Sequence, residues 1–283
     1  MPELPEVETV RRRLEPLVLG RRFDRVEILD SRLTRPLDPY EVAAELVGER
    51  VAALDRRGKY LVVRFESGRA LLIHLRMTGT LLHVTAGPPP EQTPHVRAVV
   101  SLDDGSDVIY LDIRRFGTWV LAEPGEAEPY LRERLGREPL AQAFTSKRLG
   151  QVLAGRRAPV KAAILDQRRL AGIGNIYADE ALWRARIHPQ RPAGELDDAE
   201  LRALHRGIRA ALKAGIARQG ATLSTYRTPD GGRGAMQHEF KVYGREGEPC
   251  ERCGRPIEKI RTAGRGTWYC PGCQSFGGIT CNE

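Results

Sequence analysis

The sequence contains no long apolar run. None of its apolar stretches approaches the ~18–20 residues that a membrane-spanning helix needs. Its first ten residues, MPELPEVETV, are acidic and lack the basic and apolar regions of a secretory signal peptide. We therefore expect a protein of the cytoplasm or nucleoid with no membrane partner.

Lysine is scarce. The 283 residues include 45 Lys and Arg against 37 Asp and Glu, a formal net charge of +8, yet only six of the cations are Lys. Arginine favours bidentate contact with phosphate, so nucleic acid is one interpretation of this excess. A solvated, arginine-rich surface is the other, and charge alone does not separate the two.

Cysteine is also rare, and four of the five cysteines form two CxxC pairs separated by 16 residues. This spacing is typical of a zinc ribbon, in which four thiolates surround one ion and leave no position for water. Two disulfides are the alternative. The expected ligands of one structural Zn²⁺ are Cys250, Cys253, Cys270 and Cys273, and Cys281 is expected to be a free thiol in the tail.

The spacing of apolar residues divides the rest of the chain. Helical spacing is found over 5–19, followed by eight short runs rich in Val, Ile and Leu that predict an antiparallel sandwich or barrel. The predicted strands are 22–29, 50–55, 59–66, 70–77, 80–84, 98–104, 107–113 and 118–123.

A Glu- and Pro-rich connection over 124–139 is followed by helical spacing, which makes the protein an α+β multidomain chain. The predicted helices are 146–155, 159–170, 176–187 and 198–220. The predicted domains are 1–123 (sandwich with a leading helix), 124–240 (helical), 241–275 (zinc-finger β-hairpin) and 276–283 (tail).

A turn between two predicted helices has two glycines close together. Gly172 and Gly174 flank Ile173, and a helix is expected to begin near Asn175. Backbone N–H groups in such a turn can approach a phosphate closely, as in helix–hairpin–helix proteins that bind DNA. The alternative is an ordinary tight turn in which Asn175 caps the helix.

An ordered set of motifs adds a resemblance. MPELPEVETV, GKYLV, HLRMTG, DIRRFG, GIGNIYADEAL, VYGREGEPC and the two CxxC pairs follow one another between Met1 and Gln274. In this the chain resembles bacterial formamidopyrimidine-DNA glycosylases. The resemblance implies an eight-stranded β-sandwich, a helix–two-turn–helix domain and a C-terminal zinc finger.

The resemblance also implies an activity, that of a DNA glycosylase (a hydrolase) and abasic-site lyase of base excision repair. Members excise oxidised purines such as 8-oxoguanine and formamidopyrimidines from duplex DNA, then cut the abasic site by β,δ-elimination. The damaged nucleotide leaves the base stack to reach the protein. The expected partner is double-stranded DNA with oxidised purines or abasic sites, bound by a monomer.

The resemblance assigns catalytic roles to five residues. Pro2, once Met1 is removed, is a secondary amine that attacks the sugar and forms a Schiff base. Glu3 protonates the opening sugar or the leaving base, and Glu6 helps to hold the sugar. Lys59 takes part in β-elimination and contacts phosphate. Arg265 contacts phosphate and is assigned the proton of δ-elimination, but a guanidinium gives up its proton poorly, so we expect it to stabilise charge instead. Taken alone, Glu3 and Glu6 could simply be acidic residues of a first helical turn.

The resemblance also assigns contacts with DNA. Met77, Arg114 and Phe116 would fill the gap left by the extruded nucleotide, with Arg114 facing the orphaned base, which we expect to be cytosine. Met77 and Phe116 could otherwise be core residues at strand ends. The remaining predicted contacts are His74, His95, Arg156, Lys161, Asn175 and Tyr243.

Two departures leave alternatives open. The chain continues beyond the last CxxC-Gln, and the loop 222–239, expected to close over the flipped base, has an Arg- and Gly-rich composition with Met236. A relative of endonuclease VIII that prefers oxidised pyrimidines is one alternative, which Leu4 argues against. A non-catalytic zinc-finger protein that binds damaged DNA is the other.

Overall fold

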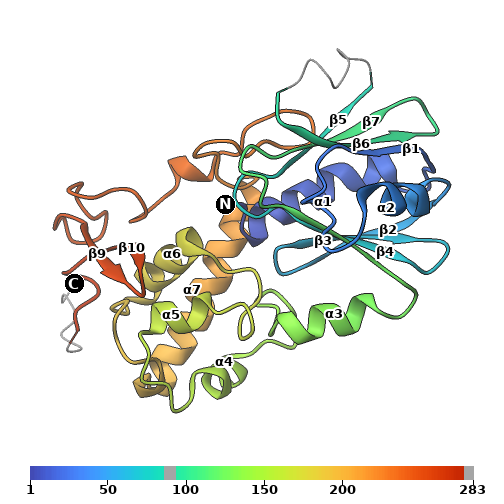
Figure 1. Ribbon diagram of the computed structural model, residues 1–283. Helices are drawn as coiled ribbons and strands as arrows, with labels where there is room; N and C mark the ends of the chain where they lie inside the picture. The colour runs from blue at the N-terminus through green and yellow to red at the C-terminus, as the bar shows by residue number, and fades with distance from the viewer. Residues whose placement is uncertain (86–93, 277–283) are drawn as a thin grey trace. The chain divides into compact units, whose positions relative to one another are not determined.

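The computed structural model describes residues 1–85 and 94–276 (Figure 1). Contacts divide the chain into two compact units, 1–133 with 218–237 and 134–217 with 238–283. Among the described helices, none is both long and apolar enough to cross a lipid bilayer.

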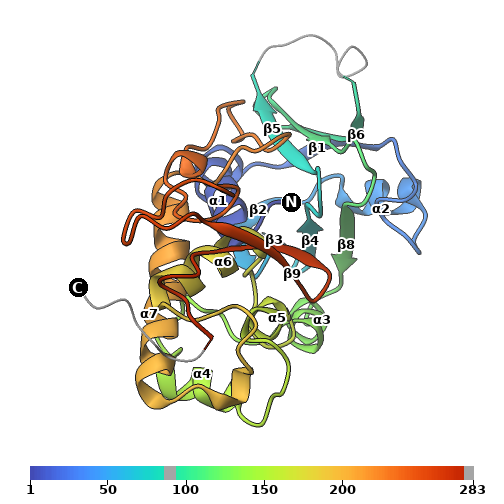
Figure 2. The same cartoon turned by 90° about the vertical axis from the view of Figure 1, so that its left-hand side faces the viewer.

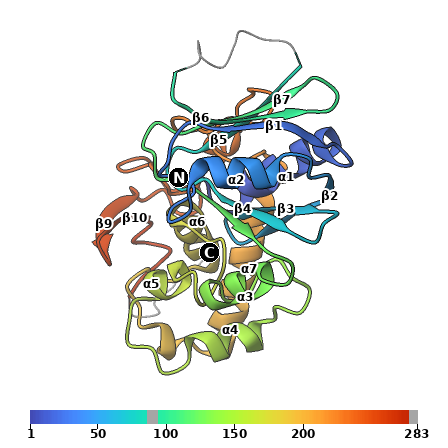
Figure 3. The ribbon, with the colours of Figure 1, turned by 45° about the vertical axis from the view of Figure 1, so that its right-hand side comes forward.

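The first unit contains two four-stranded sheets with the orders β1-β6-β7-β5 and β2-β3-β4-β8, whose neighbouring strands pair antiparallel. Figure 3 shows them as separate layers, so the fold is a sandwich and not a barrel. The strands are β1 (Phe23–Ile28), β2 (Val51–Arg57), β3 (Tyr60–Phe65), β4 (Ala70–His74), β5 (Thr80–Val84), β6 (Val96–Leu102), β7 (Asp107–Leu111) and β8 (Thr118–Ala122).

Both sheets and the first helix share one apolar core. Val7, Val10 and Leu14 of this helix recur at helical spacing and are at most 3% exposed. Leu61 and Val63 of β3 alternate along their strand and pack in the same core. The helices of this part are α1 (Leu4–Val18), α2 (Pro39–Leu46) and α3 (Ala127–Arg134).

The second unit is helical, with a C-terminal hairpin. Its elements are α4 (Ser146–Leu153), α5 (Val160–Leu165), α6 (Asn175–Ala185), the 3₁₀ turn η2 (Ala193–Glu195), α7 (Asp198–Ala217), β9 (Glu258–Thr262) and β10 (Arg265–Tyr269). Figure 2 shows α7 with α4 and α6 beside it. A two-residue turn joins β9 to β10, and Ala263 and Gly264 have the positive φ angles that a tight hairpin turn requires.

The eight predicted strands and the five predicted helices are confirmed, mostly with small shifts at their ends. The helix predicted over 159–170 is shorter, since it ends at Leu165 and is followed by a turn over 167–169. Two further helices were not predicted. The first begins where Asp38 accepts hydrogen bonds from the N–H groups of Tyr40 and Glu41, a cap that Asp-Pro in the sequence could have indicated. The second, α3, lies in the stretch interpreted as a connection.

The contacts group one segment differently from the predicted domains. Residues 218–237 belong to the unit that holds the sandwich, although the predicted helical domain included them. The reason is a set of hydrogen bonds to α1, described below. Cys281 and all but the first residue of the predicted tail lie outside the described residues. The domain limits themselves stay a prediction.

The contact between α6 and α7 generates a test of stability. A Cβ at Gly207 of α7 would lie 2.5 Å from the carbonyl oxygen of Ala181 in α6, whereas one at Gly150 of α4 would meet only the end of the Leu201 side chain, at 3.0 Å. Alanine gains about 1 kcal/mol of helix propensity over glycine, but overpacking costs about 1–3 kcal/mol. Gly207→Ala should therefore lower the free energy of unfolding, while the control Gly150→Ala should leave it unchanged or raise it. Urea unfolding followed by helical circular dichroism measures both, and equal stability of the two variants would contradict the packing described.

Candidate active site, nucleic-acid contacts and metal centre

The first three residues lead directly into α1. Pro2 is buried, and Glu3 and Glu6 are 3% and 2% exposed. The Glu3 N–H donates to Glu6 Oε2 at 2.8 Å, half of a capping box that closes the first helical turn. The two predicted catalytic carboxyl groups therefore lie together beside Pro2, out of bulk water.

The other oxygen of Glu6 holds the segment 218–237. Its Oε1 accepts the Ala221 N–H at 2.8 Å, and the Tyr226 hydroxyl donates to the Glu6 carbonyl oxygen at 3.3 Å. Burial, together with the charge of Glu6, raises the pKa of Tyr226 well above its usual range, so the hydroxyl remains a donor. Gly220 has φ +78°, and a Cβ there would lie 2.7 Å from Glu6 Cγ. A glycine is therefore required where this segment passes the carboxylate.

Lys59 lies at the turn between β2 and β3 and is only 5% exposed. A carboxylate of α1 fixes this turn through an arginine: Arg56 Nε donates to Glu8 Oε2 at 3.1 Å, and Arg56 Nη1 donates to the Gly58 carbonyl oxygen at 3.0 Å. Burial alone would raise the pKa of Glu8, but hydrogen bonds from Arg11 and other arginines hold it below its usual value. An anionic Glu8 thus links the helix that begins beside Pro2 to the turn that bears Lys59.

His74 ends β4 and is uncharged. It lies opposite Tyr60 in the β3–β4 register, with ring centroids 4.7 Å apart, and its Nδ1 accepts the Arg76 N–H at 3.0 Å. Burial lowers the pKa of His74 to about 3, and the positive charges of Arg76 and Lys59 act in the same direction. With Nδ1 accepting, Nε2 carries the proton and can donate to a phosphate oxygen.

The three predicted gap-filling residues lie on the surface and not in the core. Met77 is 37% and Phe116 50% exposed, and the Arg114 guanidinium lies 4.6 Å from the centre of the Phe116 ring. Met1, Met77 and Phe116 line one cavity of about 600 Å³. Its other lining residues are Arg32, Arg35, Arg76, Arg115, Gly117 and Thr118. Met1 and two of the three predicted gap-filling side chains, Met77 and Phe116, therefore meet at one basic depression within this unit.

Two other predicted DNA contacts, His95 and Arg156, are exposed. His95 has a left-handed backbone (φ +70°), and its carbonyl oxygen accepts the Asp112 N–H at 3.0 Å. Arg156 lies in the loop between α4 and α5, held by a hydrogen bond from its N–H to the Leu153 carbonyl oxygen. His95 belongs to the first unit and Arg156 to the second, and both side chains are open to solvent.

Lys161 was expected on DNA, but its side chain is completely buried. Its Nζ lies 2.7 Å from Asp179 Oδ1 of α6 and donates to Thr267 Oγ1 and to the Gly266 carbonyl oxygen of β10, at 2.8 and 3.0 Å. Burial raises the pKa of Asp179, while Lys161 and the Trp268 N–H oppose that shift. The lysine thus holds the hairpin to the helices and does not face solvent.

Asn175 joins the same contact. It is the first residue of α6, and its Nδ2 donates to the Gly266 carbonyl oxygen at 3.0 Å. The N-cap is Gly174, so the interpretation of Asn175 as the cap is wrong. The preceding turn is closed by Gln167, whose Oε1 accepts the Gly172 N–H at 2.8 Å. Next to Gly266, Arg265 is exposed at the start of β10.

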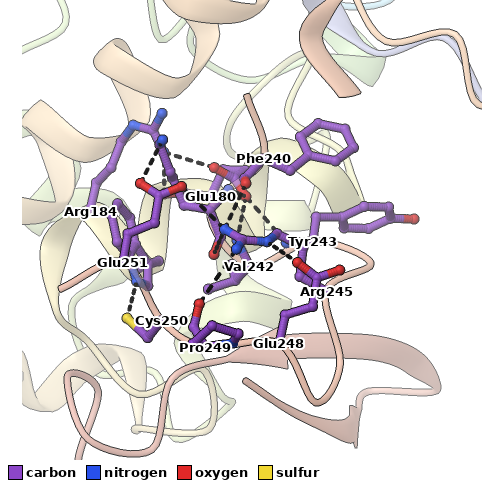
Figure 4. A network of polar contacts seen from close by, with 12 residues as sticks. Glu180, Arg184, Phe240, Val242, Tyr243, Arg245, Glu248, Pro249, Cys250 and Glu251 are labelled. Carbon is purple, nitrogen blue, oxygen red and sulfur yellow. Dashed lines mark hydrogen bonds and ion pairs between the residues drawn. The ribbon is translucent and has the colours of Figure 1, made fainter. Parts of the chain in front are cut away.

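Tyr243 is placed by a carboxylate that sequence reasoning missed. Figure 4 shows Glu180 of α6, completely buried, whose Oε1 accepts the N–H groups of Lys241, Val242 and Tyr243 at 2.8, 3.0 and 3.2 Å. Its Oε2 pairs with Arg184 at 2.8 Å. The Tyr243 ring is half-buried, 4.5 Å from that of Trp268 on β10. The sequence shows Glu180 only as an acidic residue within a predicted helix. It does not indicate that the partners of this carboxylate are backbone N–H groups about 60 residues later.

The four predicted metal ligands are grouped as zinc requires. Their Sγ atoms lie within 4.8 Å of one another, with Cys250 and Cys273 3.9 Å apart and Cys253 and Cys270 3.4 Å apart. A tetrahedron with Zn–S distances of about 2.3 Å has edges of about 3.8 Å, so these residues fit one Zn²⁺. All four are free thiols, which excludes the alternative of two disulfides. Trp183 Nε1–H points at Cys250 Sγ (3.5 Å) and supports a thiolate there.

Comparisons with known proteins cover almost the whole chain. Family models match at residues 1–119 (formamidopyrimidine-DNA glycosylase N-terminal domain), 135–227 (formamidopyrimidine-DNA glycosylase H2TH domain) and 247–275 (zinc finger found in FPG and IleRS). The formamidopyrimidine-DNA glycosylase of Symbiobacterium thermophilum is 50% identical over 97% of this chain and 89% of its own, and that of Roseiflexus is 46% identical over 97% and 100%.

Solved structures agree in fold. A variant of the Lactococcus lactis FPG bound to DNA containing Fapy-dG has a TM-score of 0.90 at 37% identity, covering 97% of this chain and 100% of its own. The wild-type L. lactis FPG bound to DNA with an oxidised pyrimidine has a TM-score of 0.88 at 37% identity, with the same coverage. MutM (FPG) from Thermus thermophilus has a TM-score of 0.86 at 45% identity, covering 98% and 100%. This chain therefore belongs to the formamidopyrimidine-DNA glycosylase family.

Proposed function

We propose that this chain acts in base excision repair, removing oxidised purines from duplex DNA and cutting the resulting abasic site. One observation carries the proposal: in a member of this family, Glu3 and Glu6 are buried together next to Pro2, and Met1, which precedes Pro2, lines a cavity with Met77 and Phe116. A relative in the family binds DNA with Fapy-dG, which supports oxidised purines as the substrate class. We further propose that it works as a monomer on the nucleoid of the cytoplasm.

The chemistry starts at the Pro2 nitrogen. While Met1 is attached, this nitrogen is an amide without a nucleophilic lone pair. Met1 is 44% exposed and lines the cavity with Met77 and Phe116, and its removal leaves a secondary amine at Pro2. The reference pKa of an α-amino group is about 7.7–8.0, so a useful fraction is unprotonated near neutral pH.

The bond changes at the sugar then involve Pro2 as nucleophile and Glu3 as proton donor. The amine attacks C1′, the bond from C1′ to the base breaks, and Glu3 supplies the proton taken up by the opening sugar or the leaving base. After the amine proton is lost, the bond from C1′ to O4′ of the sugar breaks, O4′ takes up a proton, and the nitrogen lone pair forms an iminium with C1′. This electron sink lets C2′ lose a proton as the 3′ phosphate leaves, and a second elimination releases the 5′ phosphate.

Other residues hold the DNA. Lys59 contacts phosphate and assists β-elimination, because an ammonium group can give up a proton and a guanidinium cannot. Arg265 stabilises phosphate charge in the later elimination. His74, Asn175 and Tyr243 face the backbone of the damaged strand, while Met77, Arg114 and Phe116 occupy the space vacated in the duplex. Zinc, when bound by the four cysteines, supplies structural support only, since all four positions are taken by protein ligands.

The role of Pro2 predicts a covalent adduct that depends on the mature N-terminus. Borohydride reduction with an abasic duplex should trap protein that begins at Pro2, and the same chain with Met1 retained should give no adduct. Glu3→Gln should still be trapped on abasic DNA, where no base must leave, yet excise 8-oxoguanine about 10²–10⁴-fold more slowly, the range for loss of a general acid. Mass spectrometry verifies the N-terminus. Absence of any adduct from verified Pro2 protein would overturn the enzyme assignment and favour a non-catalytic DNA-binding protein.

Lesion preference is tested with matched duplexes. Duplexes of one sequence, carrying 8-oxoguanine, a formamidopyrimidine or thymine glycol opposite its normal partner, should be cut faster with either purine lesion than with thymine glycol. Single-turnover rates measure it. A strong preference for thymine glycol would assign the chain to oxidised pyrimidines instead, a lesion class that one L. lactis relative binds.

The uncharged state of His74 predicts a pH-independent contact. Because its pKa is lowered to about 3, the ring is neutral at both pH 6 and pH 8.5 and donates through Nε2 at each. His74→Gln should therefore weaken binding of an abasic-analogue duplex by the same factor at the two pH values. Fluorescence anisotropy measures the Kd ratio. A larger loss at pH 6 would show that His74 binds as a cation with an ordinary pKa.

The zinc finger belongs to a different compact unit from the sandwich, which predicts a partial response to chelation. Removing zinc, or introducing Cys273→Ser, should weaken DNA binding by about ten-fold or more, because Arg265 lies on the hairpin that the metal supports. The strand signal in circular dichroism should persist. Collapse of that signal on chelation would refute the separation.

A further inference from the structure

The gap-filling residues come from two loops that share no strand pairing. Met77 lies between β4 and β5, and Arg114 and Phe116 lie between β7 and β8. In each case the flanking strands belong to different sheets, so each loop crosses the sandwich from one layer to the other. The flanking strands are paired, β4 with β8 and β5 with β7, but these ladders stop at the pairs His74–Thr118 and Thr80–Leu111, before the loop residues. Between these ends, side-chain contacts hold the two loops to each other.

Asp112 occupies the point where the two loops meet. It is 1% exposed. Its Oδ1 accepts the Thr78 hydroxyl, from the first loop, and the Arg114 N–H at 3.2 Å, while its Oδ2 accepts the Gly117 N–H at 2.8 Å. Thr78 Oγ1 in turn accepts the Arg114 N–H at 3.0 Å. One carboxylate thus links the residue after Met77 to both ends of the stretch that holds Arg114 and Phe116.

The backbone of Asp112 is held as well. Its N–H donates to the His95 carbonyl oxygen at 3.0 Å, and its own carbonyl oxygen accepts Arg97 Nε at 3.0 Å. The backbone of Asp112 is therefore fixed on the sandwich, and its carboxylate holds the two loops in place.

The two linked loops contain residues with unfavourable backbone angles, which would change if the loops were no longer held by Asp112. Arg76 and Arg115, neighbours of the gap-filling residues, have φ of +49° and +58°, in the left-handed region that non-glycine residues avoid. Gly79 and Gly117 close over the Tyr110 hydroxyl, and a Cβ at Gly117 would lie 1.7 Å from that oxygen. This arrangement needs a strong tether, and three hydrogen bonds to a buried carboxylate provide one.

We propose that Asp112 is a positioning residue that makes Met77, Arg114 and Phe116 enter the duplex as one preassembled unit. The inference rests on the proposed function, in which these three side chains fill the gap. A carboxylate is required because all three groups that face it are donors. An amide would turn its NH₂ toward at least one of them and lose that contact.

The test compares DNA that must be opened with DNA that is already open. Asp112→Asn should cut an 8-oxoguanine duplex about 10- to 100-fold more slowly, the range expected for one buried unsatisfied donor. It should cut an abasic site in a single strand, where no stack has to be filled, at the wild-type rate. Thr78→Val keeps the side-chain shape but removes the link between the loops, and it should show the same split without altering the Asp112 side chain.

Controls separate this inference from the proposed function. Asp107→Asn removes a half-buried carboxylate at the start of β7 and should behave as wild type on both substrates. Met77→Ala should show the duplex-specific loss, and combining it with Asp112→Asn should add less than the product of the two separate effects. Thermal unfolding confirms that every variant is folded at the assay temperature.

The outcomes are distinct. Equal losses on duplex and single strand in Asp112→Asn would overturn the inference, since Asp112 would then support the whole fold. Loss in Met77→Ala with no loss in Asp112→Asn and Thr78→Val would also overturn it while leaving the gap-filling role intact. No duplex-specific loss in Met77→Ala or Phe116→Ala would overturn the gap-filling role and the inference together.

Discussion

The carboxylate of Glu6 joins the beginning of α1 to a segment that lies 215 residues later in the chain. One oxygen accepts the Glu3 N–H and the other the Ala221 N–H, each at 2.8 Å, in a place only 2% exposed. Leaving either donor unpaired there would cost about 1–3 kcal/mol, so the two contacts support each other. Pro2 and Glu3 precede the helix and have no regular structure of their own, and their positions follow from this bond pattern.

Buried carboxylates hold other loops in the same way. Asp112 binds the loops of the proposed gap-filling residues, Glu180 binds three successive N–H groups before the finger, and Glu8 reaches the Lys59 turn through Arg56. A buried carboxylate is costly unless its oxygens are satisfied, and in each case backbone or arginine donors satisfy them. Each acid projects from a helix or from the end of a strand, so rigid elements determine where the loops lie.

This arrangement separates the acidic from the basic side chains by burial. Many acidic side chains are turned inward and hold structure, while Arg114, Arg156 and Arg265 are exposed. The formal net charge of +8 therefore understates how basic the exposed residues proposed to bind DNA are. Because DNA affinity depends on cations that can displace counterions from phosphates, exposure matters more than the total. Lys161 illustrates the point, since its ammonium is buried against Asp179 and Thr267 and contributes nothing to the surface.

Much could be predicted from the sequence because much of the pattern is local. Alternation over a few residues defined the eight strands, and two CxxC turns identified the metal ligands without knowledge of what lies between them. The order of short motifs pointed to the family and, through it, to Pro2 and Glu3. In contrast, the role of Glu6 toward Ala221 and the burial of Lys161 depend on partners that are distant in the chain. Periodicity and composition carry no information about such pairs.

By itself, then, the sequence determined the elements, the zinc ligands and the family, since each follows from residues within a few turns or from the order of motifs. Only the tertiary structure decided which charged side chains are exposed to solvent and which hold a loop. Asp112 and Asp107 are both acidic residues of one short stretch, yet one accepts hydrogen bonds from two loops and the other lies at the start of a strand, half exposed. The reason is that burial and hydrogen-bond partners arise when distant segments pack, and packing is a property of the fold and not of any one stretch of chain.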